Sequence, residues 1–549
     1  MKKLIVCFAV FGFINARAQD TISKADIPVA AKFLDLQFTD KEIDSMYGGL
    51  RDMLRNIKRM HNLSLNNNVQ MSLAQIPVLP GMKFETKQQP INWNIPSNIR
   101  LPKDKNELAF YSILQLASLI KNKKISSVEL TNFFLDRINR FDDSLKSVIS
   151  ITRDIAMQQA KQADAEIKKG KYRGPLHGIP YGLKDLFAVK GTKTTWGAEP
   201  YKEQVIEEDA YVYMKLREAG AVLIGKFTLG ALAMGDKWYG GRTNNPWNTQ
   251  YGSSGSSAGS AAATVAGLVP FAIGTETLGS IISPSHTCGA TGLRPTFGSI
   301  SRAGAMTLSW SLDKAGPICR SAEDAAVVFA FIHGTDGKDA SAVNMPFNYN
   351  KKTDVKKLKI GYAKNYFDRI TDTSRNEWKV LQTLRDLGVE LSPVVFPDSG
   401  VYNFNVVGVV IASEAAAAFD EFTRKNIDDE MTWQNRGDWP NYFRTARFYS
   451  AVDYINANRH RYLLMQEVNK LFDQYDVIIT PTYAGSQLGI TNLTGHPAIC
   501  LPTGYNASTK LPTSITFLGK LYGEANLIAV AKAYQLATPH EDVHPEMFK

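Results

Sequence analysis

Three short stretches of the 549-residue sequence carry the side chains best suited to catalysis. In the first, Lys184 ends an apolar run that glycines and a proline interrupt. The second stretch, residues 252–260, consists almost entirely of glycine and serine, and the third, residues 274–284, contains Ser280. A serine hydroxyl becomes a good nucleophile when a base removes its proton, and a lysine is such a base only when burial keeps its amine uncharged. Residues of these types favour acyl transfer through a serine.

Each stretch alone also has a plain structural interpretation. Lys184 precedes Asp185, so it could be a solvated side chain or half of a simple ion pair. The Gly/Ser run could be a flexible linker. However, it lies between Trp247 and the alanine-rich residues 261–266, which have the composition of a helix. Glycines between ordered elements usually mark backbone that turns sharply or approaches a ligand closely, so we expect an ordered run here.

Taken together, the three stretches resemble the amidase signature family. Three further motifs match the family pattern: Cys-Gly-Ala-Thr-Gly-Leu-Arg-Pro-Thr at 288–296, Ser-Leu-Asp-Lys-Ala-Gly-Pro at 311–317, and Asn-Leu-Thr-Gly-His-Pro-Ala at 492–498. The resemblance spans about residues 107 to 540 and is thin between 340 and 480. It implies hydrolysis of a carbon–nitrogen amide bond through an acyl-serine intermediate, with release of ammonia or an amine and with no cofactor or metal.

The resemblance also implies a role for each catalytic side chain. Ser280 matches the nucleophile, Lys184 matches the base, and Ser256 matches a bridging serine whose peptide bond is cis in the family. The hydroxyl of Ser256 would carry the proton of Ser280 to an uncharged Lys184. The backbone N–H groups of the turn formed by Thr277, Leu278, Gly279 and Ser280 would stabilise the oxyanion.

Two residues depart from the family pattern beside the nucleophile. Leu278 stands in place of a glycine, which adds bulk next to the oxyanion turn, and Glu276 stands in place of an aspartate. Some members that bind a carboxylated substrate carry an arginine near this position. This chain has Ile282 and Ser283 there and no arginine. We therefore expect a neutral or peptide-like amide as the substrate. Glu276 could hold the glycine-rich turn by accepting backbone hydrogen bonds, but we expect a simple structural contact there.

Two other functions fit the same motifs. The chain could be an amidotransferase A-type subunit that supplies ammonia from glutamine, or a non-catalytic binding protein on the same fold. The export signal described below argues against the first, and the presence of all three catalytic side chains argues against the second. A Ser-His-Asp triad would need a partnered histidine; His177 and His286 lie near the motifs, and we expect packed histidines there.

The elements around these motifs alternate between strands and helices. Short apolar runs at 179–187, 221–225 and 269–273 predict strands, and residues 359–363 and 389–395 predict two more on either side of a helix at 372–387. Ser126 begins a helix with a capping box. We expect an α/β fold with a large mixed central sheet and helices on both of its faces.

The sequence suggests a signal peptide, an extension and one catalytic domain. Residues 1–18 have a basic start, a short apolar run and small residues before a cleavage site near Ala18, which predicts export to the periplasm or the medium. Residues 19–100 form the extension, helical and amphipathic over 25–65 and then extended. The amidase domain covers 101–549, with an irregular, aromatic-rich lobe at 398–445 that we assign to the substrate pocket.

Composition narrows the range of partners. The net charge is +10, without a long basic stripe, so nucleic acid is a poor candidate partner. Apolar runs are too short for stable membrane insertion. Four cysteines, at 7, 288, 319 and 500, form no metal-ligand pattern, and we expect buried free thiols in the mature chain. The expected partner is a small-molecule or peptide amide; the sequence leaves the oligomeric state open.

Overall fold

The computed structural model describes residues 22–398, 405–506 and 508–549. The chain divides into two compact units between Leu65 and Asn66. Residues 66–100, which the sequence assigns to the N-terminal extension, therefore group with the larger unit. The expected signal peptide at 1–18 and its cleavage site lie outside the described residues.

The smaller unit consists of two helices, α1 (Asp26–Phe33) and α2 (Asp40–His61). Thr39 caps α2: its side chain accepts a hydrogen bond from the backbone of Glu42, whose carboxylate accepts one from the N–H of Thr39. This reciprocal pair satisfies two backbone donors that a helix start otherwise leaves open. The helical prediction for residues 25–65 is confirmed.

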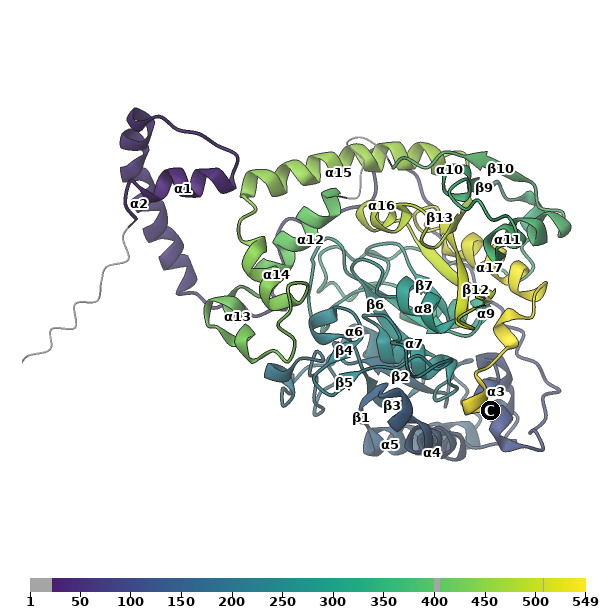
Figure 1. Ribbon diagram of the computed structural model, residues 1–549. Coiled ribbons are helices and arrows are strands. Elements are labelled where there is room, and N and C mark those ends of the chain that lie inside the picture. The colour runs from purple at the N-terminus through teal and green to yellow at the C-terminus, as the bar shows by residue number, and fades with distance from the viewer. Residues whose placement is uncertain (1–21, 399–404, 507) are drawn as a thin grey trace, which may run out of the picture. The chain divides into compact units, whose positions relative to one another are not determined.

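A mixed β-sheet forms the centre of the larger unit (Figure 1). Within the described residues it has eleven strands, in the order β1-β3-β2-β6-β8-β7-β12-β13-β11-β9-β10. Neighbours are parallel in the pairs β3–β2, β2–β6, β11–β9 and β9–β10 and antiparallel in the others. The strands are β1 (Val148–Ile151), β2 (Pro180–Lys184), β3 (Val222–Phe227), β6 (Ala272–Glu276), β7 (Thr291–Arg294), β8 (Lys314–Cys319), β9 (Ile360–Ala363), β10 (Leu391–Val394), β11 (Val477–Pro481), β12 (Ala498–Tyr505) and β13 (Pro512–Gly519). A separate pair joins β4 (Lys237–Trp238) to β5 (Gly241–Arg242).

Helices surround this sheet. They are α3 (Ile113–Lys121), α4 (Ser127–Leu145), α5 (Arg153–Lys168), α6 (Tyr211–Glu218), α7 (Ala258–Val265), α8 (Ile282–Cys288), α9 (Ala322–Ile332), α10 (Lys364–Phe367), α11 (Asn376–Asp386), α12 (Asn405–Ala418), α13 (Asp420–Arg424), α14 (Trp439–Ala446), α15 (Ala451–Phe472), α16 (Gln487–Thr494) and α17 (Glu524–Leu536). Over the residues described, none of the helices combines the length and apolarity that crossing a bilayer requires.

Both faces of the sheet are covered. Along β11, Val477 and Ile479 join one hydrophobic cluster while Ile478 joins another, because successive side chains of a strand point to opposite faces. Helices α9 and α17 pack on one face, and α7 and α8 pack on the other. The predicted α/β fold with a large mixed sheet is confirmed.

The local predictions around the motifs are largely correct. Ser126 caps α4 through a capping box with Glu129. All five residues of β2 are buried, between β3 and β6. Strand β6 lies three residues later than the predicted 269–273, so it ends at Glu276, directly before the turn that leads to Ser280.

The predicted irregular lobe is mostly helical, so this part of the prediction is wrong. Apart from 399–404, which lie outside the described residues, it contains α12, α13 and α14, and α12 packs against both α14 and the long α15 (Figure 1). Helix α12 is rich in apolar residues on every side and packs against α14, α15 and α16. A helix of that composition lacks the alternation of polar and apolar residues that reveals an amphipathic helix.

Candidate active site

Lys184 ends β2 inside the protein. Its side chain is fully buried, and its Nζ lies 2.9 Å from Ser256 Oγ, 3.1 Å from Ser257 Oγ and 2.8 Å from Thr275 Oγ1. Thr275 belongs to the neighbouring strand β6. The parallel pairing of β2 with β6 therefore places the amine against the Gly/Ser run.

The environment of Lys184 favours the uncharged amine. Burial lowers the pKa of Lys184 to about 7, although the charges of Asp313 and Glu276 act in the opposite direction. Asp185 is not its ion-pair partner, which corrects the plain reading of the sequence. The carboxylate of Asp185 instead pairs with the buried Lys226 at 2.7 Å. Near neutral pH a substantial fraction of Lys184 is therefore able to accept a proton.

Nζ lies within hydrogen-bond distance of four oxygens, including the carbonyl of Thr275 at 3.4 Å, and an ammonium would donate to them; the same site also accommodates a neutral amine, which has two N–H donors and one lone pair. Ser257 Oγ donates to the carbonyl oxygen of Thr275 at 3.0 Å, so toward Lys184 it acts as an acceptor. If the second N–H points to Thr275 Oγ1, the lone pair is left for the hydroxyl proton of Ser256. This arrangement gives Ser256 a base for its proton.

The Gly/Ser run is an ordered part of the core. The peptide bond between Gly255 and Ser256 is cis, as the resemblance implies. A Cβ at Gly255 would lie 1.8 Å from the carbonyl oxygen of Gly235, so no larger residue fits at this close approach. The N–H of Ser257 donates to the carbonyl oxygen of Ser280 at 3.1 Å, which ties the run to the third motif. The linker interpretation is therefore wrong.

Ser280 lies at the edge of this buried cluster. It is 8% exposed, against 1% for Ser256. Its hydroxyl makes no hydrogen bond to any other described residue, so the contact from Ser280 Oγ to Ser256 Oγ that a proton relay requires is not formed here. Catalytic hydrogen bonds are often long or poorly aligned before the substrate binds. In this structure the side chains of Lys184 and Ser256 are hydrogen-bonded to each other. Ser280 is linked to the Gly/Ser run through a backbone hydrogen bond with Ser257.

The turn from Thr277 to Ser280 presents backbone donors. Gly279 has φ +91°, a left-handed conformation that favours glycine. In the described part of the chain, the N–H groups of Thr277, Leu278, Gly279 and Ser280 donate to no protein acceptor. Four open donors in one turn suit a developing negative charge.

The buried carboxylate of Glu276 binds the backbone directly after this turn. One carboxylate oxygen accepts from the N–H groups of Ile281 and Ile282, each at 2.9 Å. The other accepts from Arg294 Nη1 at 2.9 Å and from Asn492 Nδ2 at 2.8 Å. Burial alone would raise the pKa of Glu276, but these partners, Arg294 foremost, lower it to about 2. Glu276 thus accepts backbone hydrogen bonds beside the turn, which is more than the simple structural contact expected from the sequence.

Comparison with known proteins agrees with this geometry. A family model described as Amidase matches residues 129–488. The chain belongs to the amidase family. It is 34% identical over 482 residues to the glutamyl-tRNA(Gln) amidotransferase A subunit of Coxiella burnetii (strain Dugway 5J108-111), covering 79% of this chain and 99% of the relative. The corresponding protein of Acinetobacter baumannii (strain AB0057) is 34% identical over 475 residues, covering 78% and 96%.

Solved structures extend the comparison. The peptide amidase of Stenotrophomonas maltophilia has a TM-score of 0.70 and 28% identity, covering 78% of this chain and 97% of its own. A bacterial aryl acylamidase of the amidase signature family shares the fold, with a TM-score of 0.71 and 23% identity, covering 79% and 97%. Membership of the amidase family makes this protein a hydrolase of carbon–nitrogen amide bonds.

The two histidines near the motifs serve this amidase as packed residues. His177 is buried beside Glu166, 3.4 Å away, and its Nδ1 accepts from the N–H of Arg173 at 3.1 Å. His286 Nδ1 lies 2.6 Å from Ser514 Oγ. Burial lowers the pKa of both histidines to about 4. Neither hydrogen-bonds to Ser280 within the described chain, so the structure offers no Ser-His pair at this serine.

A pocket opens beside the catalytic cluster. Thr275 and Thr277 line it together with residues of several loops. The other lining residues are Gln70, Leu186, Phe187, Ala233, Arg302, Ala305, Met306, Thr307, Leu308, Trp310, Asp313, Lys314 and Ala315. It lies against the first residue of the oxyanion turn, but its volume of about 20 Å³ leaves room for about one water molecule and not for a substrate.

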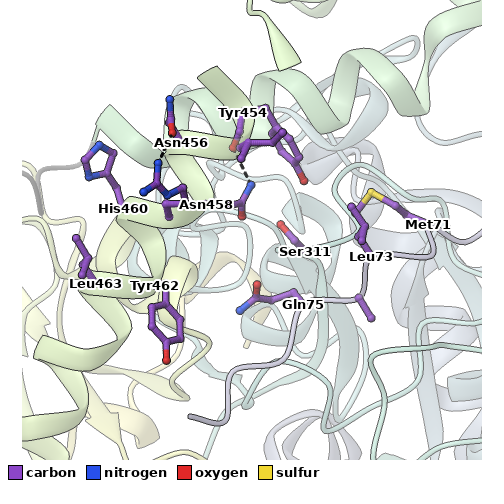
Figure 2. A pocket seen from close by; sticks show the side chains of 13 residues that line it. Met71, Leu73, Gln75, Ser311, Tyr454, Asn456, Asn458, His460, Tyr462 and Leu463 are labelled. Atoms are coloured by element: carbon purple, nitrogen blue, oxygen red, sulfur yellow. Dashed lines mark hydrogen bonds between the residues drawn. The ribbon is translucent and has the colours of Figure 1, made fainter. Parts of the chain in front are cut away.

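A second, larger cavity of about 650 Å³ lies elsewhere (Figure 2). Residues 71–75 form one wall and α15 forms the other, with Tyr454, Asn458 and Tyr462 among its lining residues. None of the residues that line this cavity belongs to the catalytic cluster. No group of three or more potential metal ligands occurs among the described residues.

The sequence reasoning missed several supporting residues. Arg294, Asp313 and Asn492 each lie in a motif that carries the resemblance, but none was given a role. Asp313 Oδ1 accepts from Thr277 Oγ1 at 2.6 Å, so it fixes the first residue of the oxyanion turn. Ser257 and Thr275, which contact Lys184 directly, had no signal beyond their presence beside the catalytic serine motifs.

Proposed function

We propose that this amidase is an exported enzyme that cleaves neutral or peptide-like amides, with Ser280 as nucleophile, Ser256 as proton relay and Lys184 as base. The observation that carries the proposal is the contact between a fully buried amine with a pKa of about 7 and the hydroxyl of Ser256 at 2.9 Å. An uncharged lysine in this position has a direct path for one proton.

The proposed reaction has two steps. Ser280 Oγ attacks the amide carbonyl carbon while its proton passes to Ser256, whose own proton passes to Lys184 Nζ. N–H groups of the turn at 277–280 hold the oxyanion, and one such donor is typically worth roughly 2.7–4 kcal/mol in the transition state. The carbon–nitrogen bond then breaks, and the departing nitrogen takes the proton back from Lys184. Water attacks the acyl-serine in the same way and releases the acid.

The charges beside the catalytic cluster support a neutral substrate. Arg302 is held by Asp339 through two of its nitrogens, at 2.7 and 2.9 Å. Lys314 donates to the carbonyl oxygen of Leu312. The guanidinium of Arg302 is therefore engaged, and burial lowers the pKa of Lys314 well below its ordinary value, so Lys314 carries little charge with which to bind a substrate carboxylate. The likeness to a peptide amidase at 28% identity supports the same substrate class.

Release of ammonia from glutamine is the second candidate. The 34% identity to amidotransferase A subunits favours it. An amidotransferase would need partner subunits and a site for the free amino acid, and the engaged Arg302 and Lys314 argue against that site.

A panel of amides tests the proposal. The mature chain should hydrolyse neutral primary amides, including amides of blocked amino acids, and Ser280→Ala should abolish turnover. Glutamine should be a poor substrate. Turnover of glutamine faster than every neutral amide by orders of magnitude would favour the second candidate. Absence of turnover on the whole panel, together with no labelling of Ser280 by a fluorophosphonate, would favour a non-catalytic binding protein.

Export is a separate part of the proposal, and it is based on the pattern of residues 1–18. Expression of the full chain in a bacterial host, followed by fractionation and N-terminal sequencing, tests it. We expect a periplasmic or secreted product that begins near Gln19. A full-length protein recovered only with the cytoplasm would contradict export and leave the catalytic proposal intact.

A further inference from the structure

One loop connects the oxyanion turn to helices that lie far along the chain. Residues 308–313 precede β8 directly and contain neither helix nor strand. Asp313, at the end of this loop, accepts a hydrogen bond from Thr277 Oγ1 at 2.6 Å. Its other carboxylate oxygen accepts from the N–H groups of Leu308 and Ser309, at 2.8 and 2.9 Å. The position of Thr277, the first residue of the oxyanion turn, therefore depends on how the loop is held.

A buried carboxylate of α12 holds this loop. Glu414 is 3% exposed, and it has no part in the proposed reaction. One of its oxygens accepts from Ser309 Oγ at 2.5 Å and from the N–H of Ser311 at 2.9 Å. The other accepts from Ser311 Oγ at 2.7 Å and from the hydroxyl of Tyr454, on α15, at 2.7 Å (Figure 2). Three of these four hydrogen bonds come from the loop.

A buried cation of α15 binds the same loop. Arg461 is 1% exposed. Its Nη1 donates to Ser311 Oγ at 2.9 Å, its Nη2 to the carbonyl oxygen of Ser311 at 2.8 Å, and its Nε to the carbonyl oxygen of Leu493 at 2.5 Å. Ser311 thus binds two buried charges of opposite sign, on two helices that pack against each other. Buried polar networks whose members are satisfied are rigid, so the loop takes its position from α12 and α15.

Ser309 joins the two carboxylates directly. Its N–H donates to Asp313 and its hydroxyl donates to Glu414. Since Asp313 also accepts from Thr277, a continuous set of hydrogen bonds leads from α12 to the oxyanion turn. The donors of that turn must point at a charge that develops only in the transition state. Misplacing a catalytic group by about 1 Å can lower the rate about 10²-fold, so the way the loop is held affects the chemical step.

We propose that Glu414 is a positioning residue for catalysis: through the 308–313 loop it holds the oxyanion turn in the orientation that stabilises the transition state. This inference rests on the proposed function. The sequence assigned residues 398–445 to the substrate pocket, whereas the hydrogen bonds give Glu414, which lies among them, a role in the rate of the chemical step. Glu414 touches neither the substrate nor the catalytic side chains in this role, and acts through Asp313 and Thr277.

Replacing Glu414 tests the inference, with an amide that the parent hydrolyses and the boronic acid of the same acyl chain, such as 3-phenylpropanamide and 2-phenylethylboronic acid. A boronic acid forms a tetrahedral adduct with a serine and resembles the transition state. Glu414→Ala should lower kcat about 10²-fold and weaken boronic acid binding by a similar factor, with KM within about twofold. Glu414→Gln should keep most of the parental kcat, because its carboxamide oxygen can still accept from Ser309 and Ser311.

Asp428→Asn is the matched control. Asp428 is 1% exposed and pairs with Arg444 at 2.7 Å, and within the described chain its side chain makes no hydrogen bond to the 308–313 loop. Urea unfolding should show a loss of stability in both Asp428→Asn and Glu414→Ala, but only Glu414→Ala should lose kcat. Ser309→Ala is a milder second variant that removes one hydroxyl from the network. It should lower kcat by about fivefold, the worth of one hydrogen bond, with KM unchanged.

Several results would overturn the inference and leave the proposed function standing. They are parental kcat in both Glu414→Ala and Ser309→Ala, equal losses of kcat in Glu414→Ala and Asp428→Asn, a fall in kcat without weaker binding of the boronic acid, or a Glu414→Gln enzyme as slow as Glu414→Ala. If Glu414→Ala does not fold, kcat of Ser309→Ala decides the question. A parent enzyme that hydrolyses no amide, and whose Ser280 resists a fluorophosphonate, would overturn the inference and the proposed function together.

Discussion

Replacing Lys184 with methionine should make the protein more stable and far less active. The pKa of Lys184 falls from an ordinary 10.5 to about 7 because the side chain is buried. At about 1.4 kcal/mol per pH unit, holding this amine in the folded state costs about 4 kcal/mol at pH 7. Methionine has a similar length and no charge to desolvate.

The substitution also removes favourable contacts. Ser256, Ser257 and Thr275 each lose a hydrogen-bond partner, at about 1 kcal/mol each. The expected net gain in the free energy of unfolding is about 1 kcal/mol at pH 7. The gain should be largest below pH 7, should vanish near about pH 8, where the cost of the uncharged amine has fallen to the roughly 3 kcal/mol of the lost hydrogen bonds, and should become a loss of about 2 kcal/mol toward pH 10, since the unfolded chain binds the extra proton across this window. Loss of a general base lowers kcat by roughly 10²–10⁴-fold.

Urea unfolding at pH 6, 7.5 and 9.5, beside amide turnover at each pH, provides the assay. Lys226→Met is a matched control, because Lys226 is also fully buried but is paired with Asp185 at 2.7 Å. Its removal leaves a buried carboxylate unpaired, so this variant should lose about 3–5 kcal/mol. A Lys184→Met protein that is less stable than the parent by a margin independent of pH would refute the argument that burial keeps the amine uncharged.

Three further predictions follow from the same cluster. Ser256→Ala should lower kcat by roughly 10²-fold or more with little change in KM; turnover at the parental rate would remove Ser256 from the proton path. Glu276→Gln should destabilise the fold by about 3–5 kcal/mol, because Arg294 stays buried without its charge partner at 2.9 Å. Thermal unfolding measures this loss of stability. An unchanged unfolding midpoint would contradict the role given to Glu276. An activated ester such as a p-nitrophenyl ester should also be hydrolysed, since the acyl-serine forms from either bond; no detectable ester turnover by an enzyme active on amides would count against the intermediate.

The catalytic motifs were readable from the sequence because each consists of neighbouring residues. Lys184, Ser256 and Ser280 could be identified because each lies in a short local pattern, and because the order of these patterns resembles that of the amidase signature family. The partners of Glu276 were not readable in this way. Asn492 lies more than two hundred positions away, and only the assembled sheet brings it to the carboxylate. The contacts of Glu414 with its loop span more than a hundred positions, so they could not be predicted either.

Secondary structure was predicted best where the sequence contains a boundary signal. Ser126 and Glu129 define the start of α4 through their reciprocal hydrogen bonds. Helix α12 has no such signal, because apolar residues dominate every side of it, and it was missed. Strand β6 was placed three residues too early because its last residues, Thr275 and Glu276, are polar. Those polar residues are the ones that contact Lys184 and the oxyanion turn.

The rate at which a fluorophosphonate labels Ser280, followed by mass spectrometry from pH 5 to pH 9, tests the central claim most directly. If an uncharged Lys184 draws the proton of Ser280 through Ser256, the label appears on Ser280. Its rate then rises about tenfold per pH unit below pH 7 and levels off above it, because the pKa of Lys184 is about 7. A rate that does not change with pH, or a label on a different serine, would contradict the account.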